Sequence, residues 1–278
     1  MDILSSREES NGALKLQKID SIKIRNVEFS YDAYEQESDT IVENTNRSNQ
    51  DNSQFLHERN ALNDIIRSFS YEFSKGNLYA ITGNNGIGKT TLTKLLIGLY
   101  VDERRGEILF NNIPMEKIDM IHARKRLIGY AEQNPLLVED SVYYNLTYKE
   151  YTNDSFVYKD EKSLKGVVSF YEQLRLLSKV LNMEQFLTEK QLSFHVNEEN
   201  TNLSGGESQK LAILKVLLKD SDVMIFDEPT SALDKETKER FIYYLTQLKN
   251  DKIIIVVTHD NNLIASCDGV FEMSTTDE

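Results

Sequence analysis

The sequence predicts an α/β fold, in which helices flank a sheet of short strands. Residues 253–257 are apolar at every position, which is typical of a strand in a sheet covered on both faces. After residue 203, short apolar runs alternate with stretches of helical periodicity. A glycine-rich segment, residues 83–90, lies between a predicted strand and a predicted helix. Together these features favour a layered α/β core over an all-helical or all-strand protein.

The first hundred residues contain two predicted strands, one predicted helix and two polar segments. Residues 1–20 are polar with scattered apolar positions, and we interpret them as a linker. Residues 22–29 alternate apolar and polar side chains, which is the period of a half-buried strand. Residues 34–60 are rich in polar and acidic side chains and cannot bury much surface, so a flexible insertion is expected there. The run 78–81 predicts a strand, and 90–99 predicts a helix.

The second half of the chain begins with a predicted strand at 127–131. From residue 141 to about 205 the chain is charged, glycine-poor and apolar at three- to four-residue spacing. This pattern indicates a helical subdomain inserted into the α/β core. After it the α/β alternation returns, with predicted helices over 206–218 and 235–248 and predicted strands over 223–226 and 253–257.

Composition excludes several classes of protein. The 278 residues carry a net charge of −13, which opposes binding to nucleic acid phosphates, so no nucleic-acid partner is expected. Cys267 is the one cysteine, which rules out an internal disulfide. The N-terminus lacks the pattern of a signal peptide, and the longest apolar run is too short to cross a bilayer. We therefore expect this chain alone to be soluble.

The glycine-rich segment fits the pattern of a phosphate-binding loop at every position. It reads Gly83-Asn84-Asn85-Gly86-Ile87-Gly88-Lys89-Thr90. Glycines let the backbone wrap closely around phosphate oxygens, and the following helix directs its positive N-terminal end at the same anion. Lys89 is expected to reach the β- and γ-phosphates, and the Thr90 hydroxyl to bind Mg²⁺. The alternative is a glycine turn before an amphipathic helix.

A pair of carboxylates follows a predicted buried strand. Asp227 and Glu228 come directly after residues 223–226, and Pro229 ends the strand. Ligand sites of open α/β sheets lie at the carboxyl ends of the strands. We therefore expect Asp227 to hold Mg²⁺ and Glu228 to polarise the attacking water. The alternative is an acidic turn without a catalytic role.

Further short motifs follow in a fixed order. They are Gln133 in a loop, the segment Leu203-Ser204-Gly205-Gly206-Glu207, the pair Asp227-Glu228, the segment Ser231-Ala232-Leu233-Asp234, and His259 after the last predicted strand. In order and spacing, the chain from about Ile22 onward resembles the nucleotide-binding domain of ATP-binding cassette (ABC) transporters. The resemblance implies a P-loop NTPase core, which is a RecA-like mixed sheet flanked by helices, with an antiparallel β subdomain and an inserted α-helical subdomain. On this basis residues 21–278 form one ABC ATPase domain.

The resemblance also implies roles for individual residues, with ATP and Mg²⁺ as cofactors. Tyr31 matches the aromatic residue that stacks on adenine, and Thr91 joins the phosphate loop. Gln133 matches a residue that contacts Mg²⁺ and the attacking water, and His259 matches one that contacts the γ-phosphate. The remaining matches lie at the interface with a second ATPase domain, where they act on the nucleotide of the opposite copy or cross the interface: Ser204, Gly205, Gly206, Glu207 and Asp234.

Several positions depart from the family pattern. Glu207 replaces the commoner glutamine at the end of the signature segment, and Ser208 and Lys210 differ from the residues usual there. The polar insertion 34–60 is longer than the family's normal turn and follows Tyr31 closely, which puts the geometry near the base in question. None of these departures removes a catalytic group.

Details of the sequence resemble exporters in particular. Residues 107–112 and 141–146 are similar to exporter segments, Glu198 matches a glutamate that contacts the membrane domain, and residues 1–20 resemble the linker from a membrane domain. We therefore expect the ATPase part of a fused exporter on the cytoplasmic side of the cell membrane. Its expected partners are a transmembrane domain and a second ATPase domain, and its cargo is a peptide or small amphipathic molecule, as in lantibiotic-type exporters.

Two other functions remain open from the sequence. The first is an ABC ATPase that drives a process other than transport, such as assembly or translation. The second is a module that binds ATP only as a structural or regulatory ligand. The presence of Lys89, Asp227, Glu228 and His259 favours hydrolysis over the second.

Overall fold

The computed structural model describes residues 11–31, 65–101, 104–149, 161–189, 191–197 and 202–274. The predicted insertion 34–60 and Glu198 lie outside these ranges. The chain divides into two compact units. Unit 1 consists of Met1–Ser74, Gly83–Lys125 and Glu272–Glu278, and unit 2 consists of Lys75–Thr82 and Arg126–Phe271.

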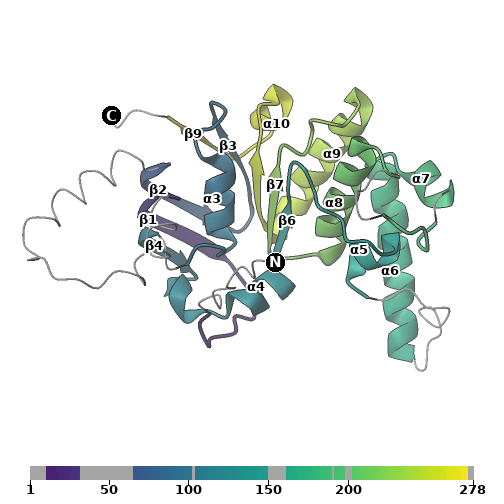
Figure 1. Cartoon of the computed structure of the whole chain (residues 1–278), viewed down its shortest axis with the longest axis horizontal. Helices are drawn as coiled ribbons and strands as arrows, with labels where there is room; N and C mark the ends of the chain where they lie inside the picture. Colours follow the sequence, from purple (N-terminus) through teal and green to yellow (C-terminus); the bar gives the residue numbers. More distant parts are fainter. Residues whose placement is uncertain are drawn as a thin grey trace, which may run out of the picture. The chain divides into compact units, whose positions relative to one another are not determined.

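Unit 1 is built on a four-stranded antiparallel sheet (Figure 1). Its strands, in the order β2-β1-β4-β5, are Ile66–Ser74, Ser21–Phe29, Arg105–Phe110 and Ile113–Pro114. The apolar residues of β1 are buried while its polar residues are more exposed, as the alternating pattern predicts. Among its described residues, unit 1 contains the helical elements α3 (Lys89–Leu96), the short 3₁₀ helix η1 (Met115–Lys117) and α4 (Met120–Arg126), whose last residue belongs to unit 2.

The described part of the predicted linker lies along residues 117–119 of unit 1. The amide of Gly12 donates to the carbonyl of Ile118 at 3.0 Å, and the amide of Leu14 donates to that of Lys117 at 3.0 Å. A Cβ on Gly12 would come within 2.1 Å of the Lys117 carbonyl carbon, so the backbones meet too closely for any side chain there. The polar composition of residues 1–20 gave no indication of this contact, because backbone groups make it.

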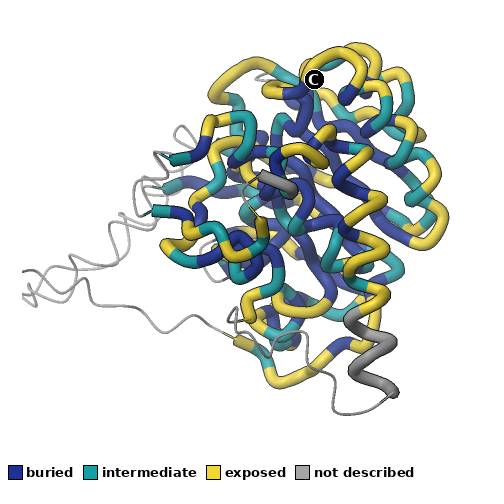
Figure 2. The backbone as a smooth tube through the Cα atoms, turned by 90° about the vertical axis from the view of Figure 1, so that its right-hand side faces the viewer, coloured by how far each residue is buried: buried dark blue, intermediate teal, exposed yellow. Residues whose placement is uncertain are grey.

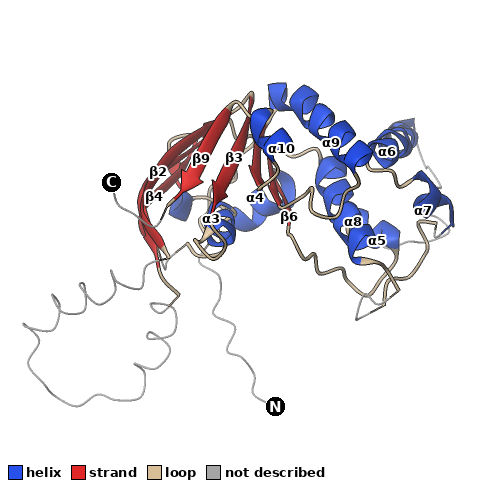
Figure 3. Cartoon of the chain, turned by 90° about the horizontal axis from the view of Figure 1, so that it is seen from above, coloured by secondary structure: helices blue, strands red, loops and turns tan. Residues whose placement is uncertain are grey.

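Unit 2 is built on a five-stranded sheet with the order β6-β7-β8-β3-β9 (Figure 3). The strands are Ile128–Ala131, Val223–Asp227, Ile253–Val257, Asn77–Gly83 and Gly269–Met273. The first four run parallel. The last residues of β3 and β9 belong to unit 1. In the part of unit 2 that the structure describes, the helical elements are α5 (Val142–Thr147), α6 (Glu161–Val180), α7 (Glu184–Glu189), α8 (Gly205–Lys219), α9 (Lys235–Leu248), the 3₁₀ helix η2 (Lys249–Asp251) and α10 (Asn261–Ala265).

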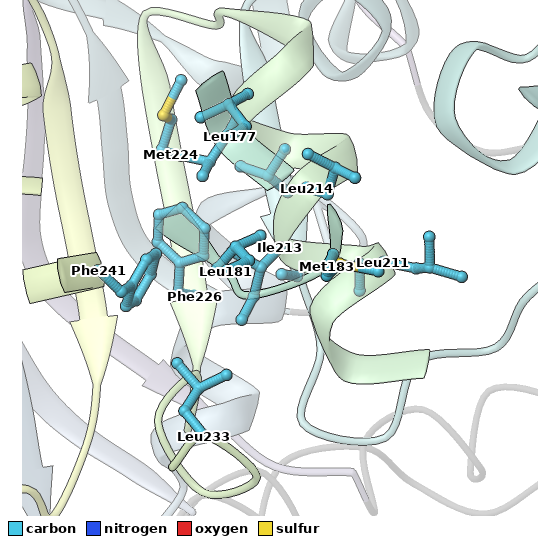
Figure 4. Packing of buried hydrophobic residues seen from close by; sticks show 14 of the residues in the cluster. Leu177, Leu181, Met183, Leu211, Ile213, Leu214, Met224, Phe226, Leu233 and Phe241 are labelled. Atoms are coloured by element: carbon cyan, nitrogen blue, oxygen red, sulfur yellow. The ribbon is translucent and has the colours of Figure 1, made fainter. Parts of the chain in front are cut away.

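The core of unit 2 includes the contacts of β7 with helices α8 and α9. Every residue of β7 and β8 is buried, and the apolar runs 223–226 and 253–257 predict this for all of them except Asp227. Figure 2 colours the backbone by burial, with buried residues in dark blue. Phe226 of β7 and Phe241 of α9 pack edge to face, with ring centroids 5.7 Å apart (Figure 4). Ile213 and Leu214 of α8 belong to the same cluster. Within the described ranges, the structure contains no helix with both the length and the apolar character to span a bilayer.

Candidate functional site

The glycine-rich loop of unit 1 connects the end of β3 to the start of α3. Gly83 has a φ of +134° and Gly88 a φ of +103°, a region of backbone space that favours glycine. A Cβ on Gly83 would lie 2.5 Å from the carbonyl oxygen of Met273, and one on Gly88 would lie 2.7 Å from a side-chain carbon of Ile65. Glycine is therefore required at both positions for conformation and for space.

Lys89 lies within this loop rather than in solvent. Its Nζ donates to the carbonyl oxygens of Gly83 at 2.7 Å and Asn84 at 3.0 Å. The first amides of a helix have no acceptor within the helix, and the first turn of α3 contains no acidic residue. Asn84, Asn85, Gly86 and Thr90 are exposed. The loop thus presents backbone N–H groups and a lysine ammonium, which suits an anion such as phosphate.

Tyr31, the predicted adenine platform, is held by contacts within unit 1. Its hydroxyl lies 3.2 Å from the hydroxyl oxygen of Thr91, the third residue of α3. Its ring packs edge to face against Phe29 and Tyr100, with centroids 5.0 and 5.7 Å away. The tyrosine ring is therefore fixed relative to the phosphate loop. Its stacking on a base stays a prediction.

In unit 2, the carboxyl ends of the parallel strands lie at one edge of the sheet. Val257 of β8 pairs in register with Ile81 of β3 on one side and with Asp227 of β7 on the other. The amide of Thr258 then donates to the carbonyl of Ile81 at 3.2 Å. The chain segments that follow β7 and β8 consequently leave the sheet at the same edge, where α/β proteins place their ligands. Gln133 lies exposed in the loop after β6, whose last residue pairs with Phe226.

The two residues predicted to act on the attacking water and the γ-phosphate lie side by side in unit 2. The Nε2 atom of His259 is 3.6 Å from Oε1 of Glu228. The Glu228 side chain is 17% exposed and that of His259 is 51% exposed, so the pair has one sheltered and one accessible partner. Asp227, directly before Glu228, is buried at 3% exposure. The structure thus brings Glu228 and His259 together, as their positions after β7 and β8 predict.

Asp260, the residue after His259, connects this loop to helix α9. Asp260 caps the N-terminus of α10 and lies 2.9 Å from Nζ of Lys238. Partial burial pushes the pKa of Asp260 up, but the bonds from Lys238 and from the α10 amides outweigh it, and the pKa falls below its ordinary value. Asp260 is therefore a charged anchor beside His259.

The signature segment begins helix α8 with a capping box. The Ser204 hydroxyl accepts the amide of Glu207 at 3.2 Å, and Oε2 of Glu207 accepts the amide of Ser204 at 2.7 Å. A glutamate at this position is thus fully compatible with the local fold. Gly205 has open space where a side chain would point. A hollow beside it is lined by residues of α7, α8 and the loop after β7, among them Ser204, Gly206, Glu207, Lys210 and Ala232.

Asp234, predicted to lie at an interface, caps helix α9 of its own chain. Its two carboxylate oxygens accept the amide and the hydroxyl of Thr237, at 2.9 and 2.7 Å. These bonds lower the pKa of Asp234 below its ordinary value. An N-cap aspartate before Lys235 is a local signal that the sequence offers. Its role across an interface stays a prediction.

Sequence reasoning missed Gln209, a buried glutamine in the second turn of α8. Its side-chain amide bonds the loop that follows β7, including the carbonyl oxygen of Glu228 at 2.8 Å. A glutamine two residues before the apolar run 211–214 was the available signal, because buried amides are nearly always hydrogen-bonded. The sequence alone does not say which segment supplies its partners.

The glycine loop before α3 and the acidic end of strand β7 define the class of P-loop nucleotide triphosphatases. The profile of the family "ABC transporter" matches residues 66–231, which is more than half of the chain. The chain therefore belongs to the ABC transporter family and is an ATP-binding domain of the kind that hydrolyses ATP in these transporters. The predicted family and fold class are confirmed.

The chain is similar to ATP-binding proteins of several transporters. It is 35% identical to the energy-coupling factor transporter ATP-binding protein EcfA1 of Mycoplasmopsis synoviae (strain 53), over 75% of this chain and 72% of that protein. It is 29% identical to the ATP-dependent lipid A-core flippase 1 of Colwellia psychrerythraea, over 96% of this chain and 39% of the flippase. It is 30% identical to the lactococcin-G-processing and transport ATP-binding protein LagD of Lactococcus lactis subsp. lactis, over 74% of this chain and 27% of LagD.

A solved structure shares the fold. The chain resembles a bacterial Atm1-family ABC exporter with ATP bound, with a TM-score of 0.68 and 22% identity, over 95% of this chain and 39% of the exporter. At this identity the likeness shows the fold alone. The chain thus spans well under half the length of the flippase, of LagD and of this exporter.

Proposed function

We propose that this chain is the ATP-hydrolysing domain of an exporter-type ABC transporter. The observation that carries the proposal is the extent of the match to the flippase. That alignment takes in 96% of this chain, whereas the alignment to EcfA1 takes in 75%. Residues beyond the common ATPase core thus have counterparts in an exporter-type protein. The higher identity to EcfA1 favours the second candidate, an ATP-binding subunit of an energy-coupling factor transporter.

In the proposed mechanism, the phosphate loop holds the triphosphate through the backbone amides of residues 83–91. Lys89 contacts the β- and γ-phosphates as a point charge. The hydroxyl of Thr90, the carboxylate of Asp227 and the amide of Gln133 offer oxygen ligands, which is the donor set that Mg²⁺ prefers. Magnesium, when bound, would neutralise charge on the phosphate oxygens. Tyr31 supplies the aromatic face for the base.

Glu228 and His259 form the reacting end of the proposed site. Glu228 accepts a hydrogen bond from the attacking water and polarises it. In this proposal His259, which lies 3.6 Å from Glu228 and is half exposed, contacts the γ-phosphate. A sheltered carboxylate next to an accessible imidazole is a suitable arrangement for directing water at a phosphorus atom. Lys89 then stabilises the charge that develops on the transferred group.

Two ATPase domains are proposed to close on two ATP molecules. Ser204, Gly205 and Gly206 of one copy contact the nucleotide held by the phosphate loop of the other, with Glu207 and Asp234 beside them. The open space at Gly205 and the exposed N-terminus of α8 support this role, because an incoming phosphate needs both. Closure and reopening would move an attached transmembrane domain. The proposal includes a location of the ATPase on the cytoplasmic side of the membrane, as is general for ABC ATPase domains.

The proposed cargo is a peptide or a small amphipathic molecule. LagD is named for the processing and transport of lactococcin G, and the flippase for lipid A-core. Both names describe molecules that are exported or moved across a membrane. The peptide class is the narrower proposal, and it depends on the similarity to LagD.

The dimer is tested by the mass of the Glu228→Gln variant in solution, with and without Mg-ATP, by size exclusion with light scattering. We expect a shift from the monomer mass of 32.1 kDa to twice that value when Mg-ATP is added. The variant should bind ATP without consuming it, so the closed state accumulates. Glu239→Gln, an exposed exchange of the same kind on α9, should show no stable dimer. A monomer with bound ATP would contradict a sandwich between two copies of this chain.

The exporter proposal is tested separately by the reading frame of the gene. We expect membrane-spanning segments encoded in frame before the ATPase domain, as a fused exporter requires. A separate short frame, next to genes for energy-coupling factor membrane subunits, would instead support the second candidate function.

A further inference from the structure

Gln209 connects helix α8 to the loop that follows strand β7. Its Nε2 donates to the carbonyl oxygen of Glu228 at 2.8 Å and to the Ser231 hydroxyl at 2.9 Å. Its Oε1 accepts the amide of Ala232 at 3.0 Å. Gln209 itself is 3% exposed, so loss of a partner would leave one of its side-chain polar atoms buried without a hydrogen bond, which is costly. One side chain therefore holds both ends of the loop 228–232.

The backbone of Glu228 needs such support. Glu228 has a φ of +47°, in the left-handed region that non-glycine residues rarely adopt. Its carbonyl oxygen accepts bonds from Gln209, from the Ser231 amide at 3.2 Å and from the Ser231 hydroxyl at 3.0 Å, while its amide donates to Val257 at 2.8 Å. The backbone conformation of Glu228 sets the direction in which its side chain points. The hydrogen bonds that hold this backbone therefore also fix that direction.

The same face of α8 meets the loop at a second point. Gly206 lies one helical turn before Gln209, so the two residues share a face of the helix. A Cβ on Gly206 would be 3.7 Å from the carbonyl oxygen of Ala232, which places the loop against the helix backbone. Ser204 begins this helix as its N-cap. The first two turns of α8 thus carry the signature segment at one end and the contact to Glu228 at the other.

We propose that Gln209 is a positioning residue for ATP hydrolysis, which fixes the backbone of Glu228 and thereby the direction of its side chain. The inference rests on the proposed function of Glu228 as the residue that polarises water. Gln209 suits this role because it donates to one end of the loop and accepts from the other. The substitution Gln209→Glu keeps the acceptor oxygen and loses the N–H donor. Gln209→Met loses both groups and fills a similar space.

These differences between side chains give the test. In the full 278-residue chain, kcat for ATP should fall at least about tenfold in both Gln209→Met and Gln209→Glu, with KM within about twofold of the parent. Ile213→Val, in the next turn of the same helix and fully buried, is the matched control. We expect it to lower the melting temperature as the Gln209 variants do and to leave kcat unchanged. Parent-like kcat in both Gln209 variants, or an equal loss in the control, would overturn the inference.

A second readout does not depend on turnover. Hydrogen exchange of the Ala232 amide, followed by NMR, should accelerate in Gln209→Met, because its acceptor is gone, and stay slow in Gln209→Glu, which keeps it. Unchanged exchange at Ala232 in Gln209→Met would overturn the inference whatever the activity. A parent chain that binds ATP and never hydrolyses it would instead contradict the proposed function, while the exchange data still decide whether Gln209 holds the loop.

Discussion

Replacing Glu228 by glutamine should lower kcat for ATP hydrolysis by about 10²- to 10⁴-fold, the range expected when a general base is lost. Glutamine keeps the shape of the side chain and leaves the backbone bond from Glu228 to Val257 intact. It also keeps an oxygen facing His259, so the local geometry should survive. What is lost is the negative charge that draws a proton from water in the transition state. The measurement is steady-state phosphate release at saturating Mg-ATP.

Binding of ATP should be retained in the same variant, because the phosphate loop belongs to a different part of the chain. A fluorescent ATP analogue should titrate Glu228→Gln with an affinity close to that of the parent. Glu239→Gln removes one carboxylate from an exposed position of α9 and should hydrolyse at the parental rate. If Glu228→Gln turned over as fast as Glu239→Gln, another group would have to polarise the water.

Local sequence signals predicted the sheet and the helices of unit 2 closely. Strand β8 coincides with the apolar run 253–257, and helix α9 coincides with the predicted 235–248. Both depend on information within a few residues: an uninterrupted apolar run in one case, and helical periodicity in the other. Predicted helix 90–99 is the counter-example, because α3 ends at Leu96 and Gly98 takes a φ of +72°. Glycine in this conformation ends a helix.

Contacts between distant segments were beyond the reach of local patterns. The bonds of Gln209 join residues about twenty positions apart in the chain, and nothing in the α8 sequence indicates the partner. Gly12 meets Ile118 through backbone atoms alone, so no side-chain pattern marks that contact. For the predicted site residues, the motifs identified which residues belong to the site. The strand register explains their positions, because Asp227 pairs with Val257 and the segments after both residues leave the sheet together. Motifs are informative because the fold fixes where each strand ends.

Replacing Phe226 by alanine should cost about 3 to 5 kcal/mol of unfolding free energy, the range for a large aromatic side chain lost from a core. Phe226 is fully buried in the middle of the parallel sheet, and its ring meets that of Phe241 edge to face. Whole domains are stable by only about 5 to 15 kcal/mol, so this one change removes a large part of the total. The measurement is urea unfolding followed by circular dichroism, with the midpoint compared between variant and parent.

The control is Tyr243→Ala, which removes an aromatic ring from the same helix as Phe241 at a position 68% exposed to solvent. It should change the unfolding free energy by less than about 0.5 kcal/mol, as surface substitutions usually do. The double variant Phe226→Ala, Phe241→Ala should lose less than the sum of the single losses, because the two rings share one contact. Strict additivity would mean that the rings contribute independently.

Asp227 follows Phe226 directly, so loss of the Phe226 ring should also loosen the carboxyl end of β7. ATP hydrolysis should therefore fall in the folded fraction of Phe226→Ala, while it is unchanged in Tyr243→Ala.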